Sequence, residues 1–312
     1  MKNFTKLIKK LGNHKKGKMV SNGTELAFLC PTSNLVAYMP TTLDTGLYYT
    51  KSYINGDVEC FSDTRYDSIK EFNDKSFEEI DFLPSMELVD YTSTDAFREA
   101  LQCVFYCEGT YTATNGHILY TTHPTNPSAE KPNYDEGILI NRDVLIAVAS
   151  IVGKVNVPKI KFSFSKKMNA VLVVVDDIKI VFVNSEVVYP KFMQVIPLYP
   201  ELIAEIKVNG NLKTMLKDTK VGGISFIELG DSKVSTYRED YPDGFTPTEL
   251  DIDVKGNVHT KLSLNLKMLE IVLSNKKGSY KLLGNKENRN GAIIIKNEND
   301  TRVIMPLRRV NI

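Results

Sequence analysis

The sequence contains no tryptophan, only four cysteines and only four histidines among its 312 residues. Four cysteines in a chain this long are too few for a disulfide-stapled fold and indicate a reducing compartment, for which we expect the cytoplasm. No Cys-x-x-Cys pair occurs, so the spacing does not predict a zinc site. Cys103 and Cys107, four residues apart, are instead expected to be small buried side chains on one face of a helix.

Long apolar runs and enzyme signatures are also missing. The apolar run Val171–Val175 has only the length of a strand, far below the roughly 18 residues of a membrane span, and the charged N-terminus has no apolar secretory segment. The sequence holds no HExxH, GxSxG, P-loop or GxGxxG motif, and its histidines are scattered. A metal-dependent hydrolase built on Asp and His is a distant alternative that elemental analysis would test. We expect no enzyme activity, no catalytic residue, no metal and no cofactor.

The charge of the chain is balanced overall but unevenly distributed. Its 39 basic and 38 acidic residues give a net charge of +1, and 42% of the residues are hydrophobic, which is ordinary globular composition. Residues 1–20, however, carry seven lysines and no acid, whereas residues 21–90 carry four basic and thirteen acidic residues, a difference of 4 − 13 = −9. Basic clusters of this kind can follow nucleic-acid phosphates.

The basic N-terminus has the pattern of a short amphipathic helix. Its apolar residues Phe4, Leu7, Ile8 and Leu11 recur at helical spacing, with lysines between them. A solvated helix face is the alternative interpretation of the same lysines.

Short strands separated by turn residues dominate the remainder of the chain. Residues 86–197 and 198–312 show one order: a strand, a helix, several strands, a second helix and three strands. Asn141 and Asn265 are expected to cap the two second helices. Residues 1–85 show one helix and several strands, with Asn55-Gly56 as a hairpin turn, and so resemble a reduced copy. The sequence therefore predicts an α+β fold with domains at 1–85, 86–197 and 198–312.

Two further predictions concern the start of the second domain. Residues Met86–Tyr91 are expected to form a strand. Ser93 or Thr94 is then expected to cap a helix with Phe97, Ala100, Leu101, Val104 and Phe105 on its buried face.

Three segments in these repeats resemble the bacterial DNA polymerase III β sliding clamps. Tyr111–Tyr120 (YTATNGHILY) is similar to the family's ATDGHRL segment, Val188–Pro197 (VYPKFMQVIP) to its junction between the second and third domains, and Val303–Arg308 (VIMPLR) to its C-terminal motif. Their order agrees with the repeat. The resemblance covers residues 86–312 and is that of a divergent member, of a kind that a phage or mobile element would also encode.

The resemblance implies a DNA-clamp fold in which repeated domains form a ring, with antiparallel sheets outside and helices lining a hole. Such a ring encircles duplex DNA without reading its sequence and tethers polymerases and clamp loaders through short peptide motifs. Three domains per chain imply a homodimer; if residues 1–85 are an appendage, a trimer follows. A clamp-like adaptor that binds replication proteins without forming a ring is the main alternative.

The family's three motifs build one hydrophobic pocket for partner peptides. Carried over to this chain, the pocket comprises Thr114, Gly116, His117, Ile118, Leu119, Pro190, Gln194, Val195, Val303, Met305, Pro306, Leu307 and Arg308. The family's Asp, its following Arg and a junction Arg are here Asn115, Ile118 and Gln194, so the pocket is less charged than usual.

A protein that slides should contact phosphates through mobile basic side chains rather than through base edges. Helices that line a hole should therefore carry lysine or arginine. The candidate DNA-facing residues are Lys6, Lys9, Lys10, Arg98, Arg142, Lys154, Lys213, Lys217, Lys220, Lys267, Lys276 and Lys277.

Overall fold

The fold is described from a computed structural model. It describes residues 2–11, 17–30, 34–56, 60–62, 76–80, 85–122, 137–152, 160–197, 200–208, 225–230, 233–238, 248–249, 252–255, 262–273, 278–285, 291–296 and 300–306. Two compact units divide the chain. Unit 1 comprises Met1–Val89, Asp95–Gly109 and Asp135–Val188, and unit 2 comprises Asp90–Thr94, Thr110–Tyr134 and Tyr189–Ile312. The three-domain division at 85/86 and 197/198 stays a prediction.

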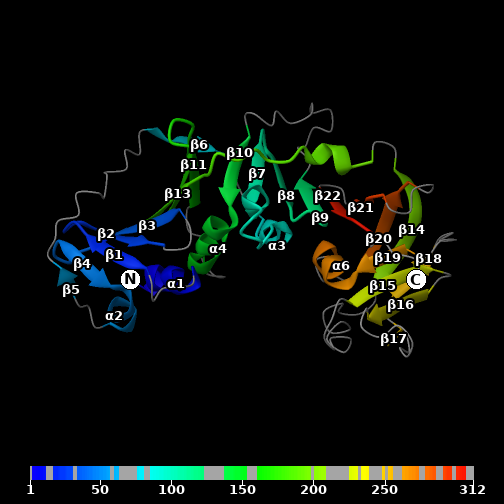
Figure 1. Cartoon of the computed structure of the whole chain (residues 1–312), viewed down its shortest axis with the longest axis horizontal. Helices are drawn as coiled ribbons and strands as arrows, with labels where there is room; N and C mark the ends of the chain where they lie inside the picture. Colours follow the sequence, from blue (N-terminus) through cyan, green and yellow to red (C-terminus); the bar gives the residue numbers. More distant parts are fainter. Residues whose placement is uncertain are drawn as a thin grey trace. The chain divides into compact units, whose positions relative to one another are not determined.

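Unit 1 is built on a nine-stranded antiparallel sheet that joins distant parts of the sequence (Figure 1). At its centre, β3 pairs with β13, so that Leu35 lies opposite Phe182 and Tyr38 opposite Lys179. In spatial order the strands are β5 (Cys60–Ser62), β4 (Gly46–Tyr49), β1 (Lys18–Ser21), β2 (Glu25–Leu29), β3 (Leu35–Pro40), β13 (Ile178–Val183), β12 (Ala170–Val175), β11 (Ile160–Ser165) and β6 (Glu78–Ile80).

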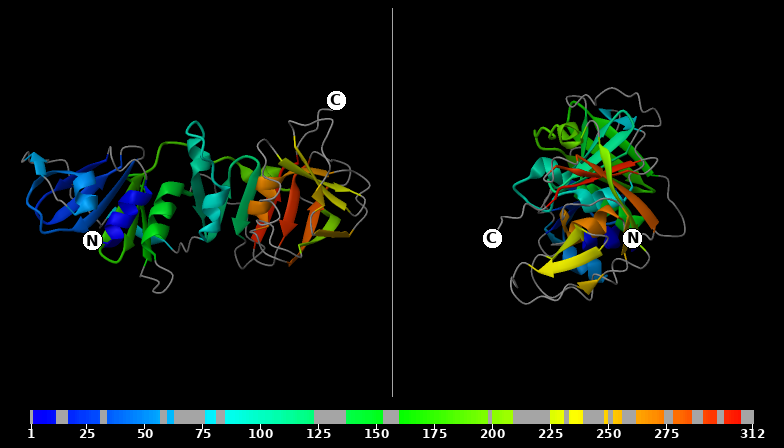
Figure 2. Two further views of the ribbon diagram at one scale, coloured as in Figure 1. Left: turned by 90° about the horizontal axis from the view of Figure 1, so that it is seen from below. Right: turned by 90° about the vertical axis from the view of Figure 1, so that its right-hand side faces the viewer.

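Helices α1 (Lys2–Lys10) and α4 (Arg142–Ile151) pack against each other in unit 1 (Figure 2). In α1 the side chains of Phe4, Leu7 and Ile8 are completely buried, as the helical spacing predicts. The ring of Phe4 meets that of Tyr53 edge-on, with 6.4 Å between their centroids. The predicted amphipathic N-terminal helix is therefore confirmed.

The asparagine caps of the repeated segments are also confirmed. The side chain of Asn141 accepts a hydrogen bond from the Asp143 backbone N–H at 2.8 Å, and that of Asn265 accepts one from the Met268 N–H at 3.1 Å. The helices that follow are α4 and α6 (Leu266–Val272). Each of these helices directly follows one strand and is followed by three more strands. The two orders are β10 (Ile138–Asn141)–α4–β11–β12–β13 and β19 (Leu262–Asn265)–α6–β20–β21–β22, as the repeat predicted.

The prediction for residues 86–105 is wrong in both of its parts. Glu87–Tyr91 forms the short helix α3 rather than a strand, because Ser85 accepts hydrogen bonds from the N–H groups of Glu87 and Leu88. The helix expected after Ser93 is limited to the 3-10 turn η2 (Glu99–Gln102), which strand β7 (Cys103–Cys107) follows. Both cysteines are buried as expected, but on a strand.

Phe97, which was expected in the core of that helix, is instead 98% exposed. The reason is local: the carboxylate of Asp95 accepts a hydrogen bond from the Phe97 N–H at 3.0 Å, and this competes with helical hydrogen bonding. In unit 1, β7 pairs with β10, and Cys103 lies opposite Asn141.

The sequence also predicts a strand at Leu47–Tyr53, and this prediction is wrong beyond Tyr49. Strand β4 ends at Tyr49, and Thr50–Asn55 forms helix α2, so residues 1–85 do contain a second helix. Gly56, with φ of 92°, ends this helix as a left-handed C-cap and is not part of a hairpin turn. The helix escaped prediction because its N-cap, Tyr49, makes no side-chain capping hydrogen bond.

The buried thiol of Cys103 on β7 makes the stability of unit 1 depend on pH, which can be tested. Burial, with smaller contributions from Glu99 and Asp143, raises the pKa of Cys103 from 9.0 to about 12. Between these values the unfolded chain loses the thiol proton and the folded chain keeps it, so stability falls as pH rises above 9. At pH 10 we expect a loss of about 1 kcal/mol from this group.

Urea unfolding of the wild type and of Cys103→Ala at pH 7 and pH 10 measures that contribution. Burial also raises the pKa of Tyr38, to about 12, so both proteins are expected to lose stability. The variant should lose about 1 kcal/mol less than the wild type. An identical pH dependence of the two proteins would contradict a buried, protonated thiol.

Unit 2 contains two antiparallel sheets (Figure 1). One run of seven strands has the order β8 (Thr110–Thr114), β9 (Ile118–Thr122), β22 (Asp300–Ile304), β21 (Ile293–Lys296), β20 (Gly278–Gly284), β14 (Glu201–Val208) and β18 (Ile252–Lys255). The other sheet has the order β17 (Thr248–Glu249), β16 (Lys233–Arg238), β15 (Ser225–Gly230) and β19. Helix α6 contacts strands of both sheets, namely β9, β15, β19 and β22.

The repeat in residues 198–312 also predicts a short helix at Asn211–Lys217, which lies outside the described residues. In the described part of the chain, no helix is long and apolar enough to cross a membrane.

Candidate functional site

The turn between β8 and β9 carries the first of the three sequence motifs. Asn115 Oδ1 accepts hydrogen bonds from the N–H groups of His117 at 2.9 Å and Ile118 at 3.0 Å. The Thr114 hydroxyl donates to the Ile118 carbonyl at 2.7 Å. Gly116 has φ of 90°, a conformation that L side chains rarely adopt. The residue types TNGHI therefore specify a tight turn closed by its own side chains.

The C-terminal motif lies directly beside this turn. Strand β22 pairs with β9, so that Leu119 lies opposite Val303 and Ile118 opposite Ile304. The hydrogen bonding between the two segments continues beyond the end of β22, because the Met305 N–H donates to the His117 carbonyl at 2.8 Å. Two motifs that are almost 190 residues apart in sequence are thus adjacent in one sheet, as the predicted pocket requires.

The junction motif forms the 3-10 turn η3 (Phe192–Val195), which is anchored to β8. The buried Tyr189 hydroxyl donates to the Thr112 carbonyl at 3.3 Å, and its ring packs edge-on against that of Phe192. Met193, Gln194 and Val195 remain exposed on this anchored turn. Unit 2 therefore holds η3, the β8–β9 turn and the end of β22, each fixed to the same sheet.

The predicted pocket residues differ in exposure. Thr114, Ile118, Leu119 and Val303 are buried and form the base of the motifs. The accessible members are the exposed Gly116, His117, Pro190, Gln194 and Val195 and the half-buried Met305 and Pro306. Leu307 and Arg308 lie outside the described residues.

Helix α6 adds a residue that the sequence analysis did not single out. The side-chain amide of Asn115 donates to the Met268 sulfur at 3.7 Å, which places the first turn of α6 beside the β8–β9 turn. Met268 is partly accessible and apolar, like Met193 and Met305. Met268 is the third residue of α6 after the N-cap Asn265, and nothing in the neighbouring sequence indicates its contact with Asn115.

The predicted DNA-facing residues fall into distinct environments. Lys6, Lys9 and Lys10 are exposed on α1, opposite its buried face, and Lys267 is exposed on α6. Lys154, Lys213, Lys217, Lys220, Lys276 and Lys277 lie outside the described residues.

The two arginines among these candidates are less available to contact DNA than the exposed lysines, because one is ion-paired and the other is partly buried. Arg98 does not lie on a helix; it precedes η2 and pairs with Asp95 at 3.5 Å. Arg142 begins α4, where its Nε is buried with no hydrogen-bond partner within the described part of the chain. Its neighbour Asp143 has a raised pKa, because burial outweighs the opposing effect of Arg142. Among the candidates that the structure describes, the exposed lysines are therefore the three on α1 and Lys267 on α6.

Among the described positions, no group of three or more His, Cys, Asp or Glu side chains could hold a metal ion. His117 is the one histidine within the described residues, and its backbone closes the β8–β9 turn.

No family model matches the sequence, and no curated protein matches it significantly.

Solved structures, in contrast, resemble the chain over its full length. Caulobacter crescentus pol III beta is 13% identical with a TM-score of 0.72, and the match covers 99% of this chain and 97% of that one. The DNA polymerase sliding clamp from Pseudomonas aeruginosa is 12% identical with a TM-score of 0.68, covering 99% and 98%. DNA polymerase III, beta subunit, from Thermotoga maritima is 14% identical with a TM-score of 0.67, covering 99% and 96%. The chain therefore has the α+β fold of the bacterial DNA sliding clamps.

Proposed function

We propose that the chain is a DNA sliding clamp, a non-enzymatic processivity factor that encircles duplex DNA in the cytoplasm and tethers replication proteins. One observation carries the proposal: the fold matches polymerase III beta subunits over 99% of this chain and 96–98% of theirs. A match to one repeated domain would be compatible with many roles. A match that includes every domain of a clamp subunit is what a chain that forms the same ring requires.

The exposed lysines of α1 support the DNA-binding part of the proposal. Three lysines project from a helix that has no acidic residue and whose apolar face is fully buried. Flexible ammonium groups contact phosphates without reading bases, and the affinity they provide depends on salt. This is the kind of contact that permits sliding.

The peptide-binding part rests on the accessible surface formed by Met193, Val195, His117, Met305 and Pro306. These residues lie on three segments fixed to one sheet, and apolar side chains predominate among them. An extended peptide with apolar anchors suits such a surface. A Pseudomonas aeruginosa sliding clamp has been solved bound to griselimycin, which supplies a ready probe.

The peptide site predicts a specific loss of binding. Val195→Ser combined with Met305→Ala should weaken binding of griselimycin, and of a fluorescein-labelled hexapeptide ending in Leu-Phe, at least tenfold, because each substitution removes apolar contact area. Fluorescence anisotropy measures both affinities. The matched control is Val183→Ser, which alters a valine of similar exposure on β13. Equal affinities of the double variant and the wild type would refute this site.

The oligomeric state distinguishes the proposed ring from its alternatives. Three domains per chain predict a homodimer with twice the 35.1 kDa mass of the chain. Light scattering at low micromolar concentration and several salt concentrations measures this mass. Three times the chain mass would indicate a trimer and make residues 1–85 an appendage. A persistent monomer would favour the second candidate function, a clamp-like adaptor without a ring, which the acidic stretch 21–90 suggests.

A further inference from the structure

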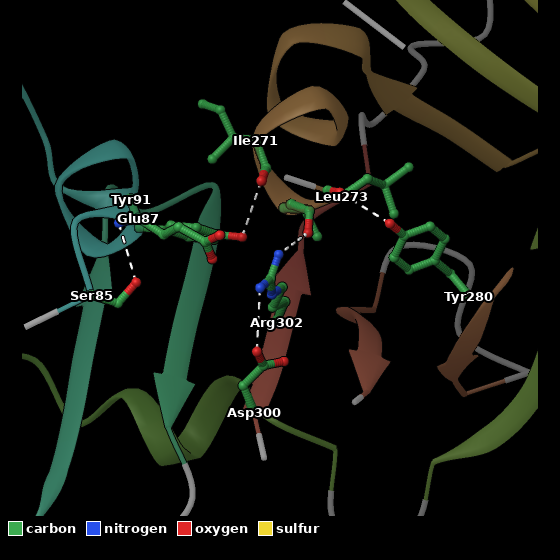
Figure 3. A network of polar contacts seen from close by, with 9 residues as sticks. Ser85, Glu87, Tyr91, Ile271, Leu273, Tyr280, Asp300 and Arg302 are labelled. Carbon is green, nitrogen blue, oxygen red and sulfur yellow. Dashed lines mark hydrogen bonds and ion pairs between the residues drawn. The ribbon is translucent and has the colours of Figure 1, made fainter. Parts of the chain in front are cut away.

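A cluster of polar and aromatic side chains surrounds the C-terminal end of α6 (Figure 3). The last carbonyl groups of this helix receive hydrogen bonds from three separate segments of unit 2. Arg302 Nη1 donates to the Val272 carbonyl at 2.8 Å, the Tyr280 hydroxyl donates to that of Leu273 at 3.1 Å, and the Tyr91 hydroxyl donates to that of Ile271 at 3.4 Å. We call these three residues together with Asp300 and Tyr120 the α6 C-terminal cluster.

Arg302 is the centre of this cluster. Its guanidinium pairs with the Asp300 carboxylate at 3.2 Å and lies over the ring of Tyr120, 5.0 Å from the centroid. Tyr120 in turn packs against Tyr91, with 5.2 Å between the ring centroids. Arg302 itself is only 9% exposed, although it belongs to β22 and lies opposite Tyr120 on β9. One buried cation therefore contacts α6, β9 and β22 together.

The interactions of Arg302 are ones that another side chain cannot fully reproduce. Its planar guanidinium donates in two directions while it stacks on an aromatic ring, which a lysine cannot do at once. A cation at the C-terminus of a helix also interacts favourably with the helix dipole. Moreover, Asp300 Oδ1 is buried with no hydrogen-bond donor in the described residues, so the carboxylate depends on Arg302.

Helix α6 needs such external support because it is short. Its seven residues make two turns, too few for a stable helix without tertiary contacts. The first turn of the same helix receives the hydrogen bond from Asn115 to Met268 at 3.7 Å. An aspartate at position 115 would still accept from His117 and Ile118 but has no N–H for Met268. The helix is thus held at one end by β22 and at the other by the β8–β9 turn.

We propose that Arg302 is a positioning residue for the peptide-binding surface. It fixes the orientation of α6 against β9 and β22, and α6 then holds Met268 beside the turn that carries Asn115 and His117. This inference rests on the proposed peptide-binding function. In this proposal the buried Arg302, which is distant in sequence from the β8–β9 turn, determines the shape of the peptide-binding surface.

Methyl NMR of the full chain labelled at methionine tests the positioning directly, without any ligand. Arg302→Met should shift the Met268 methyl resonance, identified by its absence in Met268→Leu, whereas Arg302→Lys should shift it less. Tyr280→Phe is the matched control, because it removes one hydrogen bond from the same end of α6 but leaves β22 in contact with the helix. An unmoved Met268 resonance in folded Arg302→Met would overturn the proposal.

The affinities of the same variants for griselimycin and for the labelled hexapeptide then test whether the position of α6 affects peptide binding. Arg302→Met should weaken binding about tenfold and Arg302→Lys about threefold, while Tyr280→Phe should stay within twofold of the wild type. If Arg302→Met does not fold, Arg302→Lys carries the test on both readouts. Equal weakening by Tyr280→Phe and the Arg302 variants would mean a merely structural role and overturn the inference. If the wild type binds neither probe, the proposed tethering function fails, whereas the NMR result still decides the positioning role.

Discussion

Replacing Lys6, Lys9 and Lys10 together by alanine is expected to lower the affinity of the protein for a short DNA duplex by roughly two to three orders of magnitude at 0.1 M salt. Each lysine that neutralises a phosphate contributes about 0.9 to the slope of log affinity against log salt concentration, so the slope should fall by about 2.7. All three side chains are exposed on α1, and alanine favours the helix, so the fold should be retained. Fluorescence anisotropy with a labelled duplex between 50 and 200 mM salt gives both quantities.

A second triple variant tests whether the loss of DNA affinity is specific to the lysines of α1 or follows from the lower net charge alone. Lys18, Lys166 and Lys167 are also exposed but lie at the start of β1 and in the turn between β11 and β12. Their replacement by alanine removes the same charge and should change the slope by less than about 1. If both triples weaken binding equally, α1 has no special part in DNA binding, and the placement of these lysines toward DNA must be abandoned.

Phe4→Ala should lower the stability of unit 1 by about 3–5 kcal/mol. The Phe4 side chain is completely buried on α1 and meets the Tyr53 ring of helix α2. Truncating it leaves a cavity where α1 meets the rest of the unit. Hydrogen exchange measured by mass spectrometry should show roughly hundredfold or faster exchange in α1 and in strands β1 to β4.

The control for this variant is Lys6→Ala, on the exposed face of the same helix. It should leave exchange in the strands unchanged, since surface substitutions of this kind usually alter stability by less than about 0.5 kcal/mol. Acceleration confined to α1 in Phe4→Ala would show that the helix is a dispensable appendage. That result would weaken the expectation that residues 1–85 form a true, reduced clamp domain.

The parts of the fold that could be predicted are those with a local physical signature. Phe4, Leu7 and Ile8 mark the buried face of α1 by their spacing alone, and the asparagines at 141 and 265 mark helix starts by their capping chemistry. Helix α2 has no such cap, and the sequence analysis assigned it to a strand. Around Phe97, the helical spacing of apolar residues was misleading, because the Asp95 side chain intercepts a backbone N–H that a helix would use.

The candidate site was predictable only in part, for a similar reason. The TNGHI segment contains every side chain that closes its own turn, so its shape follows from sequence. Nothing local indicates that Met268 lies beside Asn115 or that Arg302 supports the end of α6. Likewise, exposure separates the buried Leu119 and Val303 from the accessible Val195 and Met305, although all four are apolar residues of the same motifs.

The sequence by itself determined the α+β character of the chain, the repeated order of an asparagine-capped helix followed by three strands, the basic face of α1 and the three motifs, because periodicity, capping and charge act over a few residues. Only the tertiary structure decided that β3 pairs with β13 and β9 with β22, which brings Leu35 to Phe182 and Leu119 to Val303. Pairings over more than 140 residues depend on which sheet edges meet once whole layers pack together. That choice is made by the burial of complete faces, and no short stretch of sequence records it.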